Sequence, residues 1–136
     1  MSRRSDQRRA AVFALYQHAQ RGIELDEVFE PDATMLTRAL AYAAQDYAPE
    51  LDEVISRHAT GWTIDRIAPL ERAIMRIALL EILYPDVAPG ETPIPPEGAI
   101  DEAVETAKTY CGAQAPGFVN GILAAALREL RETSRQ

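Results

Sequence analysis

The chain has 136 residues, of which 47% are hydrophobic and 26% are charged, and its formal net charge is −7. This length fits one compact domain of radius roughly 14 Å, and the apolar content excludes a disordered chain. A single cysteine excludes an internal disulfide and indicates a reducing compartment. No apolar run approaches the ~20 residues of a membrane span, and the arginine-rich start lacks the apolar stretch of a secretory signal. We therefore expect a cytoplasmic protein.

The charge is unevenly distributed along the chain. Residues 1–21 contain five arginines against Asp6 alone, whereas residues 22–60 and 85–115 are acidic. Lys108 is the only lysine, and arginine makes planar, bidentate phosphate contacts that lysine does not. A basic end on an acidic body indicates a localised anion site. A solvated tail, or a simple compositional preference for arginine, is the alternative.

Hydrophobic spacing predicts helices along the first half of the chain. The first helix should run from an N-cap at Ser5 to Gln20 and end at Gly22. The second should cover residues 32–47, and a shorter one should begin at Pro49, where a missing N–H is tolerated. The residues that this spacing places toward the core are Val12, Leu15, Tyr16, Ala19, Met35, Leu36, Ala39, Leu40, Ala43, Leu51, Val54, Ile55 and, less regularly, His58.

The second half begins with a turn at residues 61–62 that leads into residues 64–67. Pro69 should open a helix that is apolar nearly all round in its second half, so it either sits centrally or faces a partner. The proline-rich residues 85–96 should form an extended loop. Two further helices should follow, one from Pro96 to a cap at Gly112 and one from near Pro116, with a frayed polar tail over 131–136. Their core residues should be Ile100, Ala103, Val104, Ala107, Val119, Ile122, Leu123, Ala126, Leu127 and Leu130.

No segment alternates in the manner of a strand. The pattern therefore predicts an all-α protein of six or seven helices. It forms a single domain over residues 1–136, with an N-terminal half of about 1–60 and a C-terminal half of about 61–136 that share one core.

Catalytic and metal chemistry are poorly represented. His18, His58 and Cys111 do not have the spacing of a metal site, since structural zinc needs four such ligands. There is no serine or cysteine nucleophile motif, and no glycine-rich phosphate loop. We therefore expect no enzymatic activity, no cofactor and no metal.

Two features of the helices resist a purely structural explanation. Arg8 and Arg9 lie in the opening of the first helix, where the helix dipole favours acidic residues; a tolerated, exposed turn is the alternative. Glu81 is a carboxylate inside an apolar run, where an unpaired charge is costly. It lies either at the rim of the core or against a cation of a partner.

The third such feature is Gly121, which costs about 1 kcal/mol relative to alanine inside a helix. With Gly117 and Asn120 it could form a small polar surface beside Phe118 that admits a ligand. Close helix–helix packing over Gly121 and a buried Phe118 are the alternative.

Four strings occur in an order that resembles the NusB family of bacterial transcription antitermination factors. They are RRSDQRRAAVFALYQ, W-x-x-x-R-x-x-PLERAIMRIALLEIL, AIDEAVETAK and FVNGIL. The resemblance covers roughly residues 3–130. It implies two small helical bundles that bind the single-stranded boxA segment of leader RNA together with the ribosomal protein NusE. It further implies that this complex joins the elongating RNA polymerase and promotes processive ribosomal RNA transcription.

The resemblance also implies roles for individual residues. The central-helix acid Glu81 corresponds to the position that faces NusE, while Trp62 and Arg66 belong to a family motif that we interpret as packing and helix-start residues. The resemblance assigns RNA binding to Arg3, Arg4, Arg8, Arg9, Tyr16, Phe118, Asn120 and Gly121. Monomers and homodimers are both compatible with it, because the apolar central helix could pair with a second copy.

The chain departs from the family pattern at several positions. Gly117 replaces a basic residue common in the family, Ala124 replaces an aspartate, and Asp101 replaces an asparagine. Residues 90–96 lengthen a loop. Lower positive and added negative charge should weaken phosphate binding, so NusE would supply much of the affinity.

Two other functions remain open at this point. One is a helical protein-interaction module with weak or lost RNA binding, which the charge of −7 and the departures favour. The other is a fragment of an enzyme, since NusB-like domains also occur fused to RNA cytosine methyltransferases. This chain contains no cofactor-binding region of that kind, so the fragment would have no activity of its own.

Overall fold

The computed structural model describes residues 3–88 and 90–135. In this part of the chain there are seven α-helices, one short 3-10 helix and no strand, which confirms the all-α prediction. The elements are α1 (Arg4–Arg21), α2 (Leu25–Val28), α3 (Met35–Asp46), α4 (Ala48–His58), η1 (Ile64–Arg66), α5 (Pro69–Leu83), α6 (Pro96–Tyr110) and α7 (Ala115–Ser134). None of the helices described is long and apolar enough to cross a membrane.

Helix α1 begins earlier than the sequence predicts. Its N-cap is Arg3, whose backbone N–H donates to Asp6 Oδ2 at 3.3 Å. Ser5 is therefore not the cap; it lies in the first turn, and its hydroxyl donates to Glu102 Oε1 on α6 at 2.7 Å. Gly22 ends the helix as predicted, in the left-handed conformation with φ 66°.

The helix α2 was not predicted, because four residues are too few to show a helical period. It precedes α3, which is capped by Thr34 accepting from the Thr37 N–H at 3.2 Å. Met35 was expected in the core but is 85% exposed, since the buried stripe of α3 starts one position later, at Leu36. Ala19 is also exposed, because the buried face of α1 comprises Ala11, Val12, Ala14 and Leu15 and ends before the last turn.

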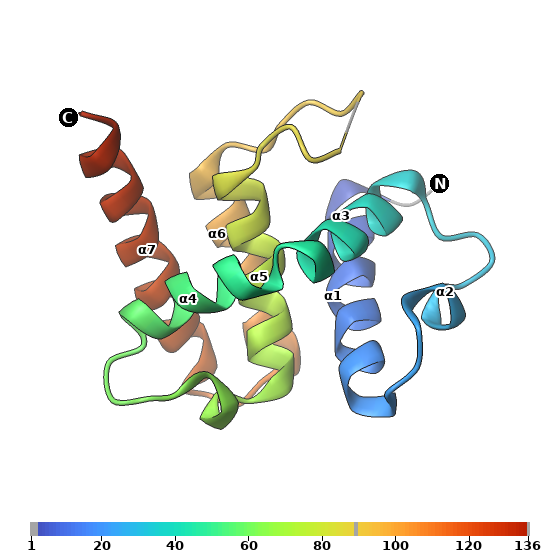
Figure 1. Cartoon of the computed structure of the whole chain (residues 1–136), viewed down its shortest axis with the longest axis horizontal. Helices are drawn as coiled ribbons and strands as arrows, with labels where there is room; N and C mark the ends of the chain where they lie inside the picture. Colours follow the sequence, from blue (N-terminus) through green and yellow to red (C-terminus); the bar gives the residue numbers. More distant parts are fainter. Residues whose placement is uncertain (1–2, 89, 136) are drawn as a thin grey trace.

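Helix α5 lies at the centre of the molecule. It packs against α1, α3, α4, α6 and α7, and Figure 1 shows α3 and α4 crossing the group of longer helices. Met75, Leu79 and Leu80 are completely buried. The all-round apolarity of this helix is thus satisfied inside the chain. The buried apolar residues from both halves form one cluster around it.

The C-terminal helices differ from the prediction at their ends. The cap of α6 is Cys111 in an extended conformation, and Gly112 does not adopt the left-handed conformation expected of a glycine cap. Helix α7 continues to Ser134, so most of the tail expected to fray is helical. An exposed ion pair from Arg131 to Glu97 joins this end of α7 to α6.

Candidate nucleic-acid interface

The N-cap and first turns of α1 carry Arg3, Arg4, Arg8 and Arg9, which we call the arginine cluster. Its exposed members are Arg3 and Arg4. The side chain of Arg3 is 86% exposed and lies 3.8 Å from Asp6. Arg4 is 59% exposed and pairs with Glu91 at 2.6 Å, in the proline-rich loop that follows α5. Both guanidinium groups can therefore reach a phosphate in solvent, although the Arg4 pair must open or share.

Arg8 has different surroundings. Its Nε donates to Glu81 Oε1 on α5 at 2.8 Å, and the two side chains are only 12% and 9% exposed. Glu81 therefore neither lacks a cation nor depends on a partner for one. The structure brings together two residues to which the resemblance assigns different roles, RNA binding for Arg8 and NusE binding for Glu81.

Arg9 lies against an aromatic pair. Its guanidinium carbon is 5.5 Å from the centre of the Tyr110 ring, which meets Phe13 edge-on at 4.9 Å. Arg9 Nε is buried and has no hydrogen-bond partner among the described residues, so the group retains donor capacity. Sequence reasoning missed Tyr110, which is 47% exposed. The sequence shows Tyr110 only as an aromatic residue at a helix end, and nothing near it in the sequence indicates the contact with α1.

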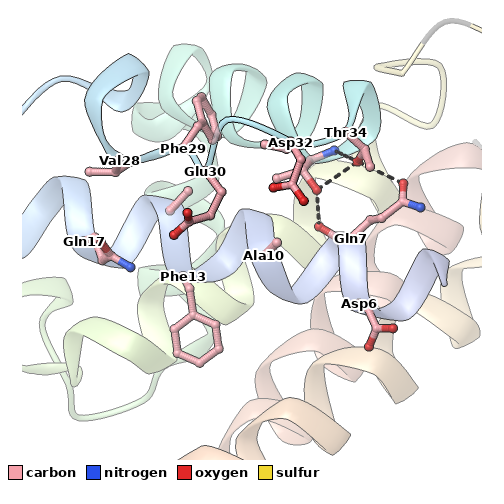
Figure 2. Close-up of a pocket in the computed structure, with 13 residues that line it drawn as sticks. Asp6, Gln7, Ala10, Phe13, Gln17, Val28, Phe29, Glu30, Asp32 and Thr34 are labelled. Atoms are coloured by element: carbon pink, nitrogen blue, oxygen red, sulfur yellow. Dashed lines mark hydrogen bonds between the residues drawn. The ribbon is translucent and has the colours of Figure 1, made fainter. Parts of the chain in front are cut away.

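A second face of α1, which begins at Asp6, is unsuited to an anion. A groove of about 310 Å³ separates it from the segment between α2 and α3, and Asp6, Glu30 and Asp32 line it without any basic residue. Gln7 fastens α1 to this segment, since its side-chain oxygen accepts a hydrogen bond from Thr34 (Figure 2). Its backbone carbonyl accepts another from Thr37 on α3. The groove itself therefore offers no cation to a phosphate.

The Phe-Val-Asn-Gly segment forms the first turns of α7. Asn120 and Gly121 are exposed, and a Cβ built on Gly121 would meet nothing within 4 Å. The alternative of close helix packing over Gly121 is therefore wrong. Phe118 is half-buried, and Tyr16 on α1 is half-buried against the core.

The sequence analysis interpreted Trp62 as a packing residue, but the structure places its ring at the surface. It is 52% exposed and lies edge-on to Phe118 with the ring centres 6.2 Å apart. Arg66 is exposed as well. Both line a surface cleft with Phe118. The sequence interpretation did not predict this cleft.

The arginine cluster and the Phe118–Gly121 segment remain separate. No hydrogen bond, ion pair or ring contact joins them within residues 3–88 and 90–135. The end of α6 links them, because Tyr110 contacts Arg9 and lies five residues before α7 begins. In the same part of the chain, no group of three His, Cys, Asp or Glu side chains could hold a metal ion.

Comparisons with known proteins agree with this architecture. The model of the NusB family matches residues 5–128. A solved structure of NusB from T. maritima is 31% identical with a TM-score of 0.78, over 94% of this chain and 92% of that one. The solution structure of NusB from Aquifex aeolicus is 27% identical with a TM-score of 0.76, over 100% and 94%. A crystal structure of antitermination factors NusB and NusE in complex with double-stranded RNA is 26% identical with a TM-score of 0.75, over 93% and 96%.

Proposed function

Because the chain belongs to the NusB family of non-enzymatic antitermination factors, we propose that it binds single-stranded boxA RNA together with NusE. Through this complex it joins the elongating RNA polymerase in the cytoplasm and promotes processive ribosomal RNA transcription. The solved structure of a relative with NusE and RNA supports the pairing of partners. Among the structural observations, the exposed arginine turn of α1 on an acidic body carries the proposal furthest.

The geometry ranks the arginines. Arg3 and Arg4 have exposed guanidinium groups, so they are the first choice for phosphates. Arg9 has an unused donor at Nε, but this atom is buried, so it can meet a phosphate only if the side chain rearranges. Arg8 can reach RNA only if its ion pair with Glu81 opens or is shared. Glu81 is only 9% exposed and already accepts from Arg8, so it can meet a basic group of NusE only if this ion pair opens or is shared.

A titration of fluorescently labelled boxA RNA, with and without NusE and at several salt concentrations, tests the proposal. The Arg3→Gln, Arg4→Gln double variant should lower the slope of log affinity against log salt by about 0.7 for each single-strand phosphate that the protein no longer neutralises. Arg21→Gln is the matched control, because Arg21 is exposed at the other end of α1. It should leave the slope unchanged.

The second candidate is a protein-interaction module whose RNA binding is weak or lost. The burial of Arg8 and the absence of a basic residue at Gly117 favour it. This alternative predicts that the protein binds NusE but shows no salt-sensitive RNA binding, even when NusE is present. A slope that the Arg3, Arg4 change does not alter would remove these arginines from the mechanism.

A further inference from the structure

A surface cleft of about 410 Å³ lies between the η1–α5 segment and the start of α7. Trp62 and Phe118 form its aromatic walls, with their ring planes inclined at 68°. The remaining lining residues are Arg66, Ile67, Ala68, Glu71, Gly112, Ala113, Gln114 and Ala115. A half-exposed tryptophan at the mouth of an apolar cleft offers a flat surface on which another ring can stack.

The polar groups at this cleft complement a nucleotide. Arg66 is exposed and has no ion pair within the described part of the chain. The first turn of α7 forms the other wall, and no side chain caps its N-terminus at Gln114, so the positive end of the helix dipole is available to an anion. These groups suit a phosphate beside a stacked base.

Glu71 gives the cleft an acceptor. It is half-buried, and no hydrogen bond or ion pair to it occurs among the residues described. Burial raises the pKa of its carboxyl group. A carboxylate that has been partly removed from water without a partner gains from any N–H donor that enters the cleft.

We infer that this cleft receives one unpaired base of the bound RNA, stacked on the exposed face of Trp62 with Phe118 at its side, with the adjoining phosphate at Arg66 and the base edge at Glu71. The inference rests on the proposed function and extends its RNA surface from Phe118 to Trp62. Base–aromatic stacking is the common device for holding single strands. Guanine fits Glu71 best, because the N1–H and N2 amino groups of its Watson–Crick edge are adjacent donors for the two carboxylate oxygens.

An RNA occupant is favoured over an apolar side chain of a protein partner for two reasons. Phe118 belongs to the segment for which RNA contact is proposed, and it forms one wall of the cleft. An apolar side chain would also leave both Glu71 and Arg66 without partners, whereas a nucleotide supplies a donor edge for one and an anion for the other.

Trp62 provides a direct test because it is the only tryptophan of the chain. Labelled boxA RNA is titrated in the presence of NusE that lacks tryptophan, while RNA anisotropy and Trp62 emission are both recorded. We expect RNA to quench the emission at the concentration at which the anisotropy saturates. Trp62→Ala should weaken binding by roughly ten- to a hundred-fold. Tyr47→Ala, which alters a partly exposed aromatic pair elsewhere, should bind as the unchanged protein does.

Base identity is tested with the same RNA in which inosine replaces each guanine, because inosine lacks the N2 amino group. The unchanged protein should bind this RNA several-fold more weakly, and Glu71→Ala should reduce that difference. Circular dichroism verifies that each variant is folded. An identical preference in the Glu71→Ala variant would overturn the assignment of the base edge to Glu71.

The remaining outcomes separate this inference from the proposed function. Salt-sensitive RNA binding with unchanged Trp62 emission, and unchanged affinity of Trp62→Ala, would overturn the inference and leave the proposed function standing. Quenching by NusE alone, with loss of NusE affinity in Trp62→Ala, would reassign the cleft to a protein. If boxA RNA does not bind with or without NusE, both proposals are wrong.

Discussion

Arg8 on α1 and Glu81 on α5 form an ion pair that is almost removed from solvent. Glu81 is tolerated within an apolar helix because Arg8 donates to it at 2.8 Å. A buried pair contributes little net stability, but removal of one partner leaves the other charge buried and unpaired. Each residue is therefore structurally required by the other, whatever it contacts in a complex.

This leads to a prediction about folding stability. Glu81→Gln should lower the free energy of unfolding by about 3 kcal/mol, whereas the double change Arg8→Met, Glu81→Leu should stay within about 1 kcal/mol of the unchanged protein. Glu91→Gln, which breaks the exposed pair with Arg4, is the control and should cost less than about 1 kcal/mol. Urea unfolding measures all three. Equal losses in the single and double variants would show that the charge pair is not the cause.

Gly121 is the residue at which helix stability and the proposed RNA contact conflict. It lies inside α7, is exposed, and has open space where a Cβ would be. Because alanine is the better helix former, Gly121→Ala should raise the free energy of unfolding by about 0.5–1 kcal/mol. If RNA approaches the backbone at Gly121, the same change should weaken RNA binding.

The control for this prediction is Gly22→Ala. Gly22 has a φ of 66°, which strains any residue with a Cβ, so this change should destabilise the protein by about 1 kcal/mol. Thermal unfolding and RNA anisotropy provide the two readouts. A stabilised Gly121→Ala protein that binds RNA with unchanged affinity would remove Gly121 from the interface.

At the scale of the elements, an acidic residue fastens α7 to α4. Glu129 accepts from Arg57 Nε at 3.1 Å and lies 3.2 Å from His58 Nε2. The hydrogen bond from Arg57, assisted by the charges of Arg57 and His58, lowers the pKa of Glu129 below its ordinary value. The ionised carboxylate is therefore favoured in the folded state.

A pH dependence follows from this lowered pKa. The stabilisation is fully present above the ordinary pKa of a glutamate, about 4.3, and is lost as the pH falls through the lowered value of the folded state. Glu129→Gln should thus be less stable than the unchanged protein at pH 7, and the difference should shrink as the pH falls toward 3. Glu132→Gln, at an exposed position on the same helix, should show no such trend. Denaturant midpoints measured across this range decide the matter, and a difference that does not change with pH would contradict the ion pair.

At the scale of the whole molecule, α5 unites the two halves of the chain. Helices from both halves pack on it, and the buried apolar residues form a single cluster. α5 belongs to the C-terminal half, and α1, α3 and α4 of the N-terminal half bury apolar residues against it. We therefore expect residues 1–136 to unfold as one cooperative domain.

Calorimetry tests this expectation. The calorimetric and van't Hoff enthalpies should agree, and Leu79→Ala should lower the free energy of unfolding by about 2–5 kcal/mol in a single transition, because Leu79 is completely buried. Leu130→Ala, at a half-buried position on α7, should cost less. Two resolved transitions, with only one shifted by Leu79→Ala, would show that the halves are independent domains.

Local rules were sufficient for much of the fold. Pro69 and Pro96 begin α5 and α6 where predicted, because proline is pre-organised for the first helical turn. Local rules were insufficient at Met35, since a methionine one position outside the buried stripe is as apolar as the leucine inside it. Local rules also failed for Trp62, which was expected to pack inside the molecule but is exposed. Hydrophobic character alone does not show whether another element covers a side chain.

The sequence by itself determined the helical class, the basic start on an acidic chain and the positions that match the NusB family. The helical class follows from hydrophobic spacing within one or two helical turns. The charge distribution and the family positions are visible in the residue order alone. Only the tertiary structure decided that Arg8 is neutralised by Glu81, that Arg9 lies on Tyr110, and that Trp62 and Phe118 share a cleft. The reason is physical, since each of these contacts joins residues far apart in the chain. Their geometry depends on how separate helices pack around α5.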